Sequence, residues 1–256
     1  MEFSQSVLAV VQARLSSRRF PSKVLYPIYD NIPLIHMILK RISSSRHIDN
    51  IVVATTCDLS DDQLVNWLKA NDYNYFRGSV SNVLERFYLA STPFSPSIIV
   101  RITADDPFKD SDIIDLAIQT ILSEPKYDYV SNTIIPTFPE GLDIEVFTFN
   151  ALQHAYQNAR LASDLEHVTP YIWTKPNIFN LFNFTNALDL SAYRLTIDYP
   201  VDLATTYKIL NYFDGDIYVP AQNILREIST GSLLLDQTCV IRNEGYINSL
   251  QSDVPN

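Results

Sequence analysis

The sequence is poor in cysteine, in basic residues and in long apolar runs. Its two cysteines, Cys57 and Cys239, stand far apart with no CxxC spacing, so neither a disulfide framework nor a zinc site is expected. Acidic residues outnumber basic ones by 29 to 19, whereas nucleic-acid binders usually carry excess positive charge. The start of the chain lacks the basic region of a signal peptide, and no apolar stretch reaches membrane length. We therefore expect a soluble, cytoplasmic protein that binds neither nucleic acid nor membranes.

The order of apolar segments indicates an α/β fold. At 46% hydrophobic content, the 256 residues are enough to bury a full core in one domain. Strands are predicted at 7–13, 50–56 and 97–105, and helices at 33–45, 60–71, 81–91 and 110–123. This alternation predicts a mostly parallel sheet with right-handed crossovers. The strands at 50–56 and 97–105 are apolar without clean alternation, which is typical of a sheet covered on both faces.

The pattern changes after about Tyr127. Residues 127–149 are rich in Tyr, Phe and Thr and contain two prolines, which favours extended or antiparallel structure. Farther along, helices are predicted at 149–160, 164–175 and 200–213, and strands at 177–184 and 193–198. We interpret the chain as one domain, 1–256, with a β-rich insertion at about 127–190.

Four cations stand on the short segment after the first predicted strand: Arg14, Arg18, Arg19 and Lys23. Ligands of such sheets bind beyond the carboxyl ends of the strands, so this exposed loop would present its cations to an anion. Arg14 and Lys23 could clamp a triphosphate, with Ser17 and backbone amides as further donors. A solvated loop paired with acidic neighbours is the alternative. The sequence GxxxxGK[ST] is absent, which disfavours P-loop chemistry.

Acidic residues follow two other predicted strands. Asp105 and Asp106 end the most apolar strand, and Asp198 ends the strand at 193–198. Oxygen ligands at that edge suit magnesium or manganese bound to a nucleotide phosphate. The alternative for Asp198 is a helix N-cap ahead of Pro200. Together with the cationic loop, these acids predict a metal–nucleoside triphosphate site.

The segment QARLSSRRFPSKVL resembles the pattern QARxxSxRLPGKVL of the CMP-sugar synthetase family, and within it the SpsF-type proteins of spore-coat and surface polysaccharide synthesis. The similarity continues in order through FRGSVSNVLERFY, RITADDPFKD, YVSNTIIPTFPEGLDIEVF, LEHVTPYIW, RLTIDYPVDL and RNEGYINSL, and so covers nearly the whole chain. The resemblance implies a Rossmann-like, three-layer sandwich of the glycosyltransferase-A kind.

The resemblance also implies roles for individual residues. Matched to the family motifs, the catalytic residues are Arg14, Lys23, Asp105 and Asp198, of which Asp105 and Asp198 would hold Mg²⁺ or Mn²⁺. The expected CTP-binding residues are Ala13, Arg14, Ser17, Arg19, Lys23, Gly78 and Asp105.

Two serines depart from the family pattern. Ser16 and Ser22 stand where the motif has glycine. A serine at a position that needs a positive φ costs steric energy that glycine avoids. Either the loop takes another conformation or CTP binds more weakly.

The acceptor is less well defined. The acidic sugars used by better-known family members call for an arginine or lysine, but residues 127–149 contain neither. A polyol or a phosphonate alcohol therefore stays open as the acceptor. The candidate acceptor-binding residues are Glu140, Asp143, Glu145 and His167, and His167 could instead pack behind the site.

The implied activity is that of an enzyme, a CTP-dependent cytidylyltransferase. It would transfer CMP to a sugar or related acceptor for surface polysaccharide or glycoconjugate biosynthesis and release pyrophosphate. A glycosyltransferase of the same fold and a non-catalytic nucleotide-binding homologue are the alternatives. The cationic loop favours the cytidylyltransferase over the glycosyltransferase, because a cytidylyltransferase must bind a free triphosphate, whereas a glycosyltransferase binds only a diphosphate sugar. The aromatic insertion further predicts a homodimer whose acceptor pocket is completed by residues from about 127 to 173; a monomer whose insertion caps its own site is the alternative. In the dimer, a charge at Phe147 should weaken association if that side chain lies at the interface, and otherwise should only destabilise the fold.

Overall fold

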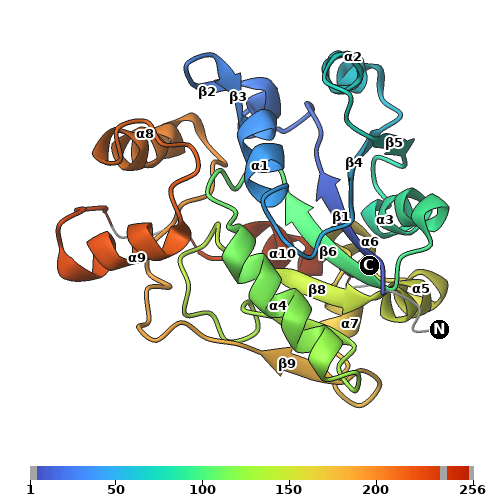
Figure 1. The fold of residues 1–256 in the computed structure, drawn as a ribbon. Helices are drawn as coiled ribbons and strands as arrows, with labels where there is room; N and C mark the ends of the chain where they lie inside the picture. The colour runs from blue at the N-terminus through green and yellow to red at the C-terminus, as the bar shows by residue number, and fades with distance from the viewer. Residues whose placement is uncertain (1–4, 237–240, 254–256) are drawn as a thin grey trace.

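The computed structural model describes residues 5–236 and 241–253, so the expectation for Cys239 lies outside the described residues. Seven strands form one sheet in the order β5-β4-β1-β6-β8-β7-β9 (Figure 1). All run parallel except β8, which is antiparallel to both of its neighbours. The strands are β1 (Val7–Gln12), β4 (Asn50–Thr56), β5 (Tyr75–Gly78), β6 (Ile98–Thr103), β7 (Tyr129–Ser131), β8 (Glu145–Thr148) and β9 (Leu181–Asn183), with a separate ribbon of β2 (Pro27–Tyr29) and β3 (Ile32–Pro33).

Helices cover both faces of this sheet, which confirms the predicted three-layer fold (Figure 1). One core cluster includes residues of α1 (Leu34–Ile42), α2 (Asp62–Ala70), α4 (Ser111–Ser123), α8 (Leu203–Tyr212) and α9 (Ala221–Thr230). The opposite cluster includes residues of α3 (Val83–Ser91), α5 (Phe149–Asn158) and α7 (Pro170–Trp173). The remaining helices are α6 (Ala162–His167), α10 (Glu244–Ser249) and 3₁₀ turns at Lys23–Leu25, Leu59–Asp61, Thr92–Phe94, Pro200–Asp202 and Leu250–Asp253.

Strand β1 illustrates why the central strands are apolar throughout. Val7, Ala9 and Val11 belong to one core cluster, and Leu8 and Val10 belong to the other. Successive side chains of a strand point to opposite faces, so a strand buried on both sides has no polar positions to alternate.

The segment 193–198 is not the regular strand that the sequence predicted. It is an extended chain with one isolated bridge, between Glu140 and Arg194. Its amides turn to different partners: that of Leu195 donates to the Glu140 carbonyl (2.7 Å), and that of Ile197 to the Asp105 carbonyl (2.8 Å). Asp198 therefore follows a segment held between two loops rather than a strand of the sheet.

Two further elements are shorter than predicted, and five were missed. The strand expected at 177–184 is reduced to β9, and the helix expected at 164–175 divides into α6 and α7 at Val168, whose φ is 73°. The sequence analysis did not include β2, β3, β5, α9 or α10.

The strands of the insertion belong to the main sheet. β8, β7 and β9 extend the sheet beyond β6, and Phe147 is completely buried there. Of the two outcomes expected for a charge at Phe147, the structure favours destabilisation of the fold, because a side chain within the sheet core cannot reach a partner. Within residues 127–149, Ile134 and Ile135 are the exposed large apolar residues.

The cationic loop is held in place from both sides. The Leu15 amide donates to the carboxylate of Asp61 (2.7 Å), and the Ser22 amide donates to the Leu15 carbonyl (2.9 Å). Asp61 is completely buried at the end of β4 and also accepts from the Thr55 hydroxyl (2.9 Å). The loop is thus fixed to the edge of the sheet rather than free in solvent.

Ser22 adopts a left-handed conformation, which glycine takes without steric cost. Its φ of 59° and ψ of 16° lie in the left-handed region, whereas Ser16 is not among the residues with positive φ. The left-handed conformation costs an L-residue with a Cβ about 1–2 kcal/mol. The Ser22 substitution is therefore accommodated by strain rather than by a rearranged turn.

We expect Ser22→Gly to raise the free energy of unfolding by about 0.5–1 kcal/mol, because relief of strain exceeds the added entropy of a glycine in the unfolded chain. Urea unfolding monitored by circular dichroism measures this. Ser16→Gly is the matched control and should be neutral or destabilising. If Ser22→Gly destabilised the protein as much as Ser16→Gly, the strain at Ser22 would be disproved.

Candidate active site

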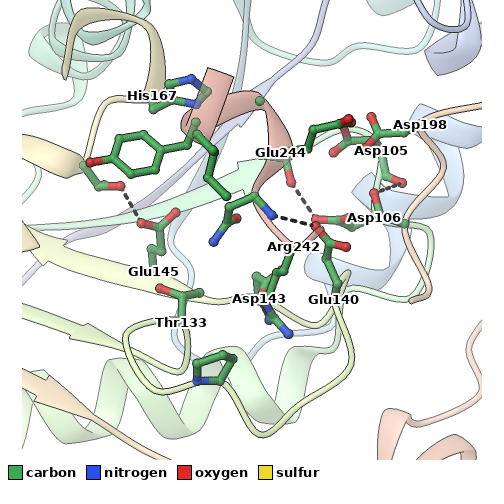
Figure 2. A pocket seen from close by; sticks show the side chains of 18 of the residues that line it. Asp105, Asp106, Thr133, Glu140, Asp143, Glu145, His167, Asp198, Arg242 and Glu244 are labelled. Carbon is green, nitrogen blue, oxygen red and sulfur yellow. Dashed lines mark hydrogen bonds and ion pairs between the residues drawn. The ribbon is translucent and has the colours of Figure 1, made fainter. Parts of the chain in front are cut away.

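A cleft of about 570 Å³ opens beyond the carboxyl end of β6. Figure 2 shows Asp105, Asp106 and Asp198 on one side of it, with Glu145 and His167 on the other. Of the residues predicted from sequence, the cleft lining includes Arg19, Asp105, Glu140, Asp143, Glu145, His167 and Asp198. The structure therefore brings all four acceptor-binding candidates together with both metal-binding candidates.

Lys23 is buried, contrary to the expectation that it lies exposed on the loop. Its ammonium donates to Asp105 Oδ2 (3.0 Å), to Asp198 Oδ1 (3.1 Å) and to the Ile197 carbonyl (2.7 Å). Burial acts to lower the pKa of Lys23, but the charges of the two carboxylates outweigh burial and raise that pKa above its ordinary value. Lys23 is thus a fixed cation that joins the loop to both acids.

The neighbouring carboxyl groups of Asp105 and Asp106 are in different electrostatic environments. Burial acts to raise the pKa of Asp105, but the charge of Lys23 reverses this and lowers it. Burial raises the pKa of Asp106 despite Lys109, whose ammonium lies 2.9 Å from Asp106 Oδ2. Asp105 is therefore the better anionic ligand of the two.

Asp198 accepts from three cations. Besides Lys23, Arg19 lies 2.5 Å from its Oδ1, and Arg194 lies 2.6 Å from its Oδ2. The Arg19 side chain is 36% exposed, against 8% for Lys23 and 6% for Arg194, so Arg19 is the one that can leave at the smallest cost. Arg194 was not singled out from the sequence, although it stands four residues before Asp198.

A second polar group lies at the carboxyl ends of β1 and β5, outside the cleft lining. Arg14 is half-buried, and its charge adds to the burial that lowers the pKa of Arg86 to about 10. Arg86 donates to the Ser79 carbonyl (2.6 Å). A Cβ on Gly78 would lie 2.9 Å from the Phe76 ring and 3.0 Å from Arg86, so a side chain there would displace one of these neighbours.

The other two predicted nucleotide-binding residues belong to the base of the loop. Ala13 is buried directly after β1, and the Ser17 hydroxyl accepts a long hydrogen bond from the Phe20 amide (3.5 Å). The structure therefore separates Ala13, Arg14, Ser17 and Gly78 from the acceptor-binding candidates and places Lys23, Asp105 and Asp198 between the two groups.

Glu145 and His167 form the inner end of the cleft. Glu145 binds Arg101 and accepts from the hydroxyls of Tyr129 (2.7 Å) and Thr169 (2.5 Å). Burial, assisted by the charge of Arg101, lowers the pKa of His167 to about 4, so its imidazole is neutral at physiological pH.

The segment from Arg242 through α10 forms another wall of the cleft. Arg242 binds Asp143 and donates to the Phe138 carbonyl (2.9 Å). Tyr246 of α10 packs edge-on against Trp173, with ring centroids 5.4 Å apart. The RNEGYINSL ending thus lies beside the catalytic candidates, although more than forty positions separate it from Asp198.

The donor set fits a nucleotide-bound metal better than a metal held by protein alone. Within residues 5–236 and 241–253, no three His, Cys, Asp or Glu side chains gather to hold an ion. Asp105 Oδ1 accepts no hydrogen bond from these residues, whereas both oxygens of Asp198 are occupied. Mg²⁺ commonly binds through one or two carboxylates, with phosphates and waters completing its shell.

Comparison with known proteins gives a consistent picture. Residues 8–223 match the sequence model of the family described as cytidylyltransferase. An uncharacterized protein of Methanocaldococcus jannaschii is 38% identical over 210 residues, which cover 81% of this chain and 84% of that protein. The spore coat polysaccharide biosynthesis protein SpsF of Bacillus subtilis is 33% identical over 204 residues, which cover 75% and 81%. A solved cytidylyltransferase of Leptospira borgpetersenii has a TM-score of 0.84 at 32% identity, covering 93% of this chain and 100% of that one.

In the described part of the chain, none of the helices has the length and apolar character needed to span a bilayer.

Proposed function

This chain belongs to the cytidylyltransferase family, and we propose that it transfers CMP from CTP to a hydroxyl group of a sugar or related acceptor in polysaccharide or glycoconjugate biosynthesis. The observation that carries the proposal is the convergence of Arg19, Lys23, Asp105 and Asp198 at a cleft large enough for such an acceptor. The likeness to SpsF, whose name refers to spore coat polysaccharide, supports the choice of acceptor class.

The reaction is a displacement at phosphorus. The acceptor oxygen forms a bond to the α-phosphorus of CTP as the bond to pyrophosphate breaks. Pyrophosphate leaves with the electron pair of that bond, and the hydroxyl proton passes to solvent. Such transfers depend on positioning and on fixed positive charge more than on covalent help from the protein. Arg14, Arg19 and Lys23 supply that charge along the carboxyl edge of β1.

We propose that CTP binds together with Mg²⁺ or Mn²⁺, held by Asp105 and by Asp198. Asp105 has an oxygen ready for a metal. When Arg19 turns to the phosphates, Asp198 Oδ1 keeps only its bond from Lys23 and has a lone pair left for the metal. A bound metal offsets phosphate charge in the transition state. The exposure of the Arg19 side chain supports this exchange, because a side chain that is 36% exposed moves without opening the core.

We also propose a homodimer in the cytoplasm, where CTP is available. Ile134 and Ile135, 39% and 64% exposed, are the apolar residues that a partner would cover, and Ile134 also lines the cleft. Light scattering should give twice the 29.2 kDa chain mass, and Ile135→Asp should reduce that mass. A mass near that of one chain would refute the dimer.

The activity is tested by pyrophosphate release from CTP in the presence of an acceptor panel. We expect chelation of divalent metal to abolish release, and Asp105→Asn to lower the rate by about 10²-fold or more, as for removal of a transition-state charge contact. Asp112→Asn, an exposed change at the start of α4, is the control and should keep the wild-type rate. Near-normal rates for Asp105→Asn at limiting magnesium would make Asp105 only a structural partner of Lys23.

A further inference from the structure

Glu244 differs from the other carboxylates that line the cleft. Its side chain is 40% exposed, and among the described residues its only cationic partner is Arg19. Each of the other lining carboxylates pairs with a cation whose side chain is at most 16% exposed. These pairs are Asp105 and Asp198 with Lys23, Asp106 with Lys109, Glu140 with Arg194, Asp143 with Arg242, and Glu145 with Arg101. Glu244 is therefore the lining carboxylate that changes partners at the smallest cost.

One guanidinium joins Glu244 to the acids of the proposed metal site. Arg19 Nη1 lies 3.3 Å from Glu244 Oε2, and Arg19 Nη2 lies 2.5 Å from Asp198 Oδ1. Since both nitrogens are bonded to the same carbon, Glu244 and Asp198 lie on the same side of the cleft (Figure 2). Glu244 thus stands beside the place where the phosphates of CTP are proposed to bind.

The oxygens of Glu244 keep hydrogen-bonding capacity for a ligand. Within residues 5–236 and 241–253, Oε1 accepts no hydrogen bond, and Oε2 accepts from Arg19 (3.3 Å) and from the Tyr199 hydroxyl (3.5 Å). Both contacts are long, because charge-assisted hydrogen bonds are commonly about 2.7–2.9 Å. When Arg19 turns to the phosphates, Tyr199 is the one described donor still near this carboxylate.

The backbone around Glu244 is held independently of Arg19. Arg242, two residues earlier, binds Asp143 and donates to the Phe138 carbonyl (2.9 Å). Tyr246, two residues later, packs edge-on against Trp173 at a ring-centroid separation of 5.4 Å. Departure of Arg19 therefore frees the carboxylate of Glu244 without releasing the segment that carries it.

His167 is the other basic group of the cleft to consider. Its Nε2 is buried and has no hydrogen-bond partner among the described residues, as is true of the Nε atoms of Arg101, Arg194 and Arg242. Figure 2, however, shows His167 across the cleft from Asp105 and Asp198. These nitrogens remain for other contacts with the acceptor, whereas Glu244 lies on the side where the phosphates are proposed to bind.

We propose that Glu244 accepts the proton of the acceptor hydroxyl during cytidylyl transfer, and that Arg19 occupies Glu244 until CTP draws Arg19 away. The acceptor O–H bond breaks as its proton passes to Glu244 Oε1, the oxygen bonds to the α-phosphorus, and pyrophosphate leaves with the electron pair of the broken P–O bond. Glu244, which is 40% exposed, then returns the proton to solvent. This inference rests on the proposed function and adds a proton acceptor to it.

The rate test compares pyrophosphate release by wild type and by Glu244→Gln at saturating CTP and magnesium. The acceptors are gluconate, glucuronate, glucose and sorbitol, and water alone in a parallel sample. Glutamine keeps the shape of the side chain but cannot take up the proton, so release should fall by about 10²-fold or more with every acceptor that supports it. Formate should restore part of the rate to Glu244→Ala.

Glu124→Gln is the matched control for the rate test. Glu124 is also an exposed glutamate with a single cationic partner, Lys126, and it lies outside the cleft lining. This variant should keep the wild-type rate. A wild-type rate for Glu244→Gln, or equal losses in the two variants, overturns the role of Glu244 as proton acceptor.

The exchange of Arg19 is tested without any acceptor, by calorimetry with CTP and magnesium. Glu244→Gln removes a competitor of the phosphates for Arg19, so this variant should bind CTP roughly twofold to fivefold more tightly, the scale of an exposed ion pair. The same change in an Arg19→Gln background should have no effect on CTP affinity. Unchanged or weaker binding by Glu244→Gln, or an equal gain in both backgrounds, overturns the exchange.

The two measurements distinguish failure of the inference from failure of the proposed function. If wild type binds CTP but releases no pyrophosphate with any acceptor, water included, the proposed transfer is wrong and the role of Glu244 falls with it. If wild type and Glu244→Gln release pyrophosphate equally, the transfer stands and the role of Glu244 alone is overturned.

Discussion

The contact on which the site depends is the ammonium of Lys23 between the carboxylates of Asp105 and Asp198. Three parts of the chain meet there: the loop after β1, the end of β6 and the extended segment that ends at Asp198. Without that cation, Asp105 would lose the charge that lowers its pKa, while Asp198 would keep its pairs with Arg19 and Arg194. The same arrangement lowers the pKa of Asp105, so the group that assembles the site also prepares Asp105 for the proposed CTP and metal.

The other cations of the cleft are also paired with carboxylates of the same chain before any ligand binds. Glycine makes one such contact possible: Gly141 has a φ of 104°, and a Cβ there would lie 2.9 Å from the Thr196 amide nitrogen. That close approach brings Glu140 beside Arg194. Arg19 in the outer part of the site is 36% exposed, whereas the paired side chains of Arg101, Arg194 and Arg242 are 16%, 6% and 16% exposed. The outer and inner parts of the site thus differ in how tightly their cations are held.

The sequence was sufficient for the central strands and for the loop after β1, because an apolar run that ends in charged residues is a local signal. It placed Asp105 correctly for the same reason. It failed where the decisive contacts are distant in the chain. Lys23 was expected to be exposed, since nothing near it in sequence reveals partners that lie 82 and 175 positions away. The ion pairs inside the cleft were not predicted either, because the sequence does not distinguish a buried arginine from a solvated one.

The most direct test of the account is the affinity of CTP and of CMP for wild-type protein and for Lys23→Met, measured by calorimetry in the presence of magnesium. If Lys23 and its two acids form the triphosphate site, the variant should bind CTP at least about tenfold more weakly, the value of one charge-assisted hydrogen bond. CMP, which lacks the two outer phosphates, should bind both proteins alike, and this also shows that the variant is folded. Equal CTP affinity for the two proteins would contradict the account, as would a parallel loss of CTP and CMP binding.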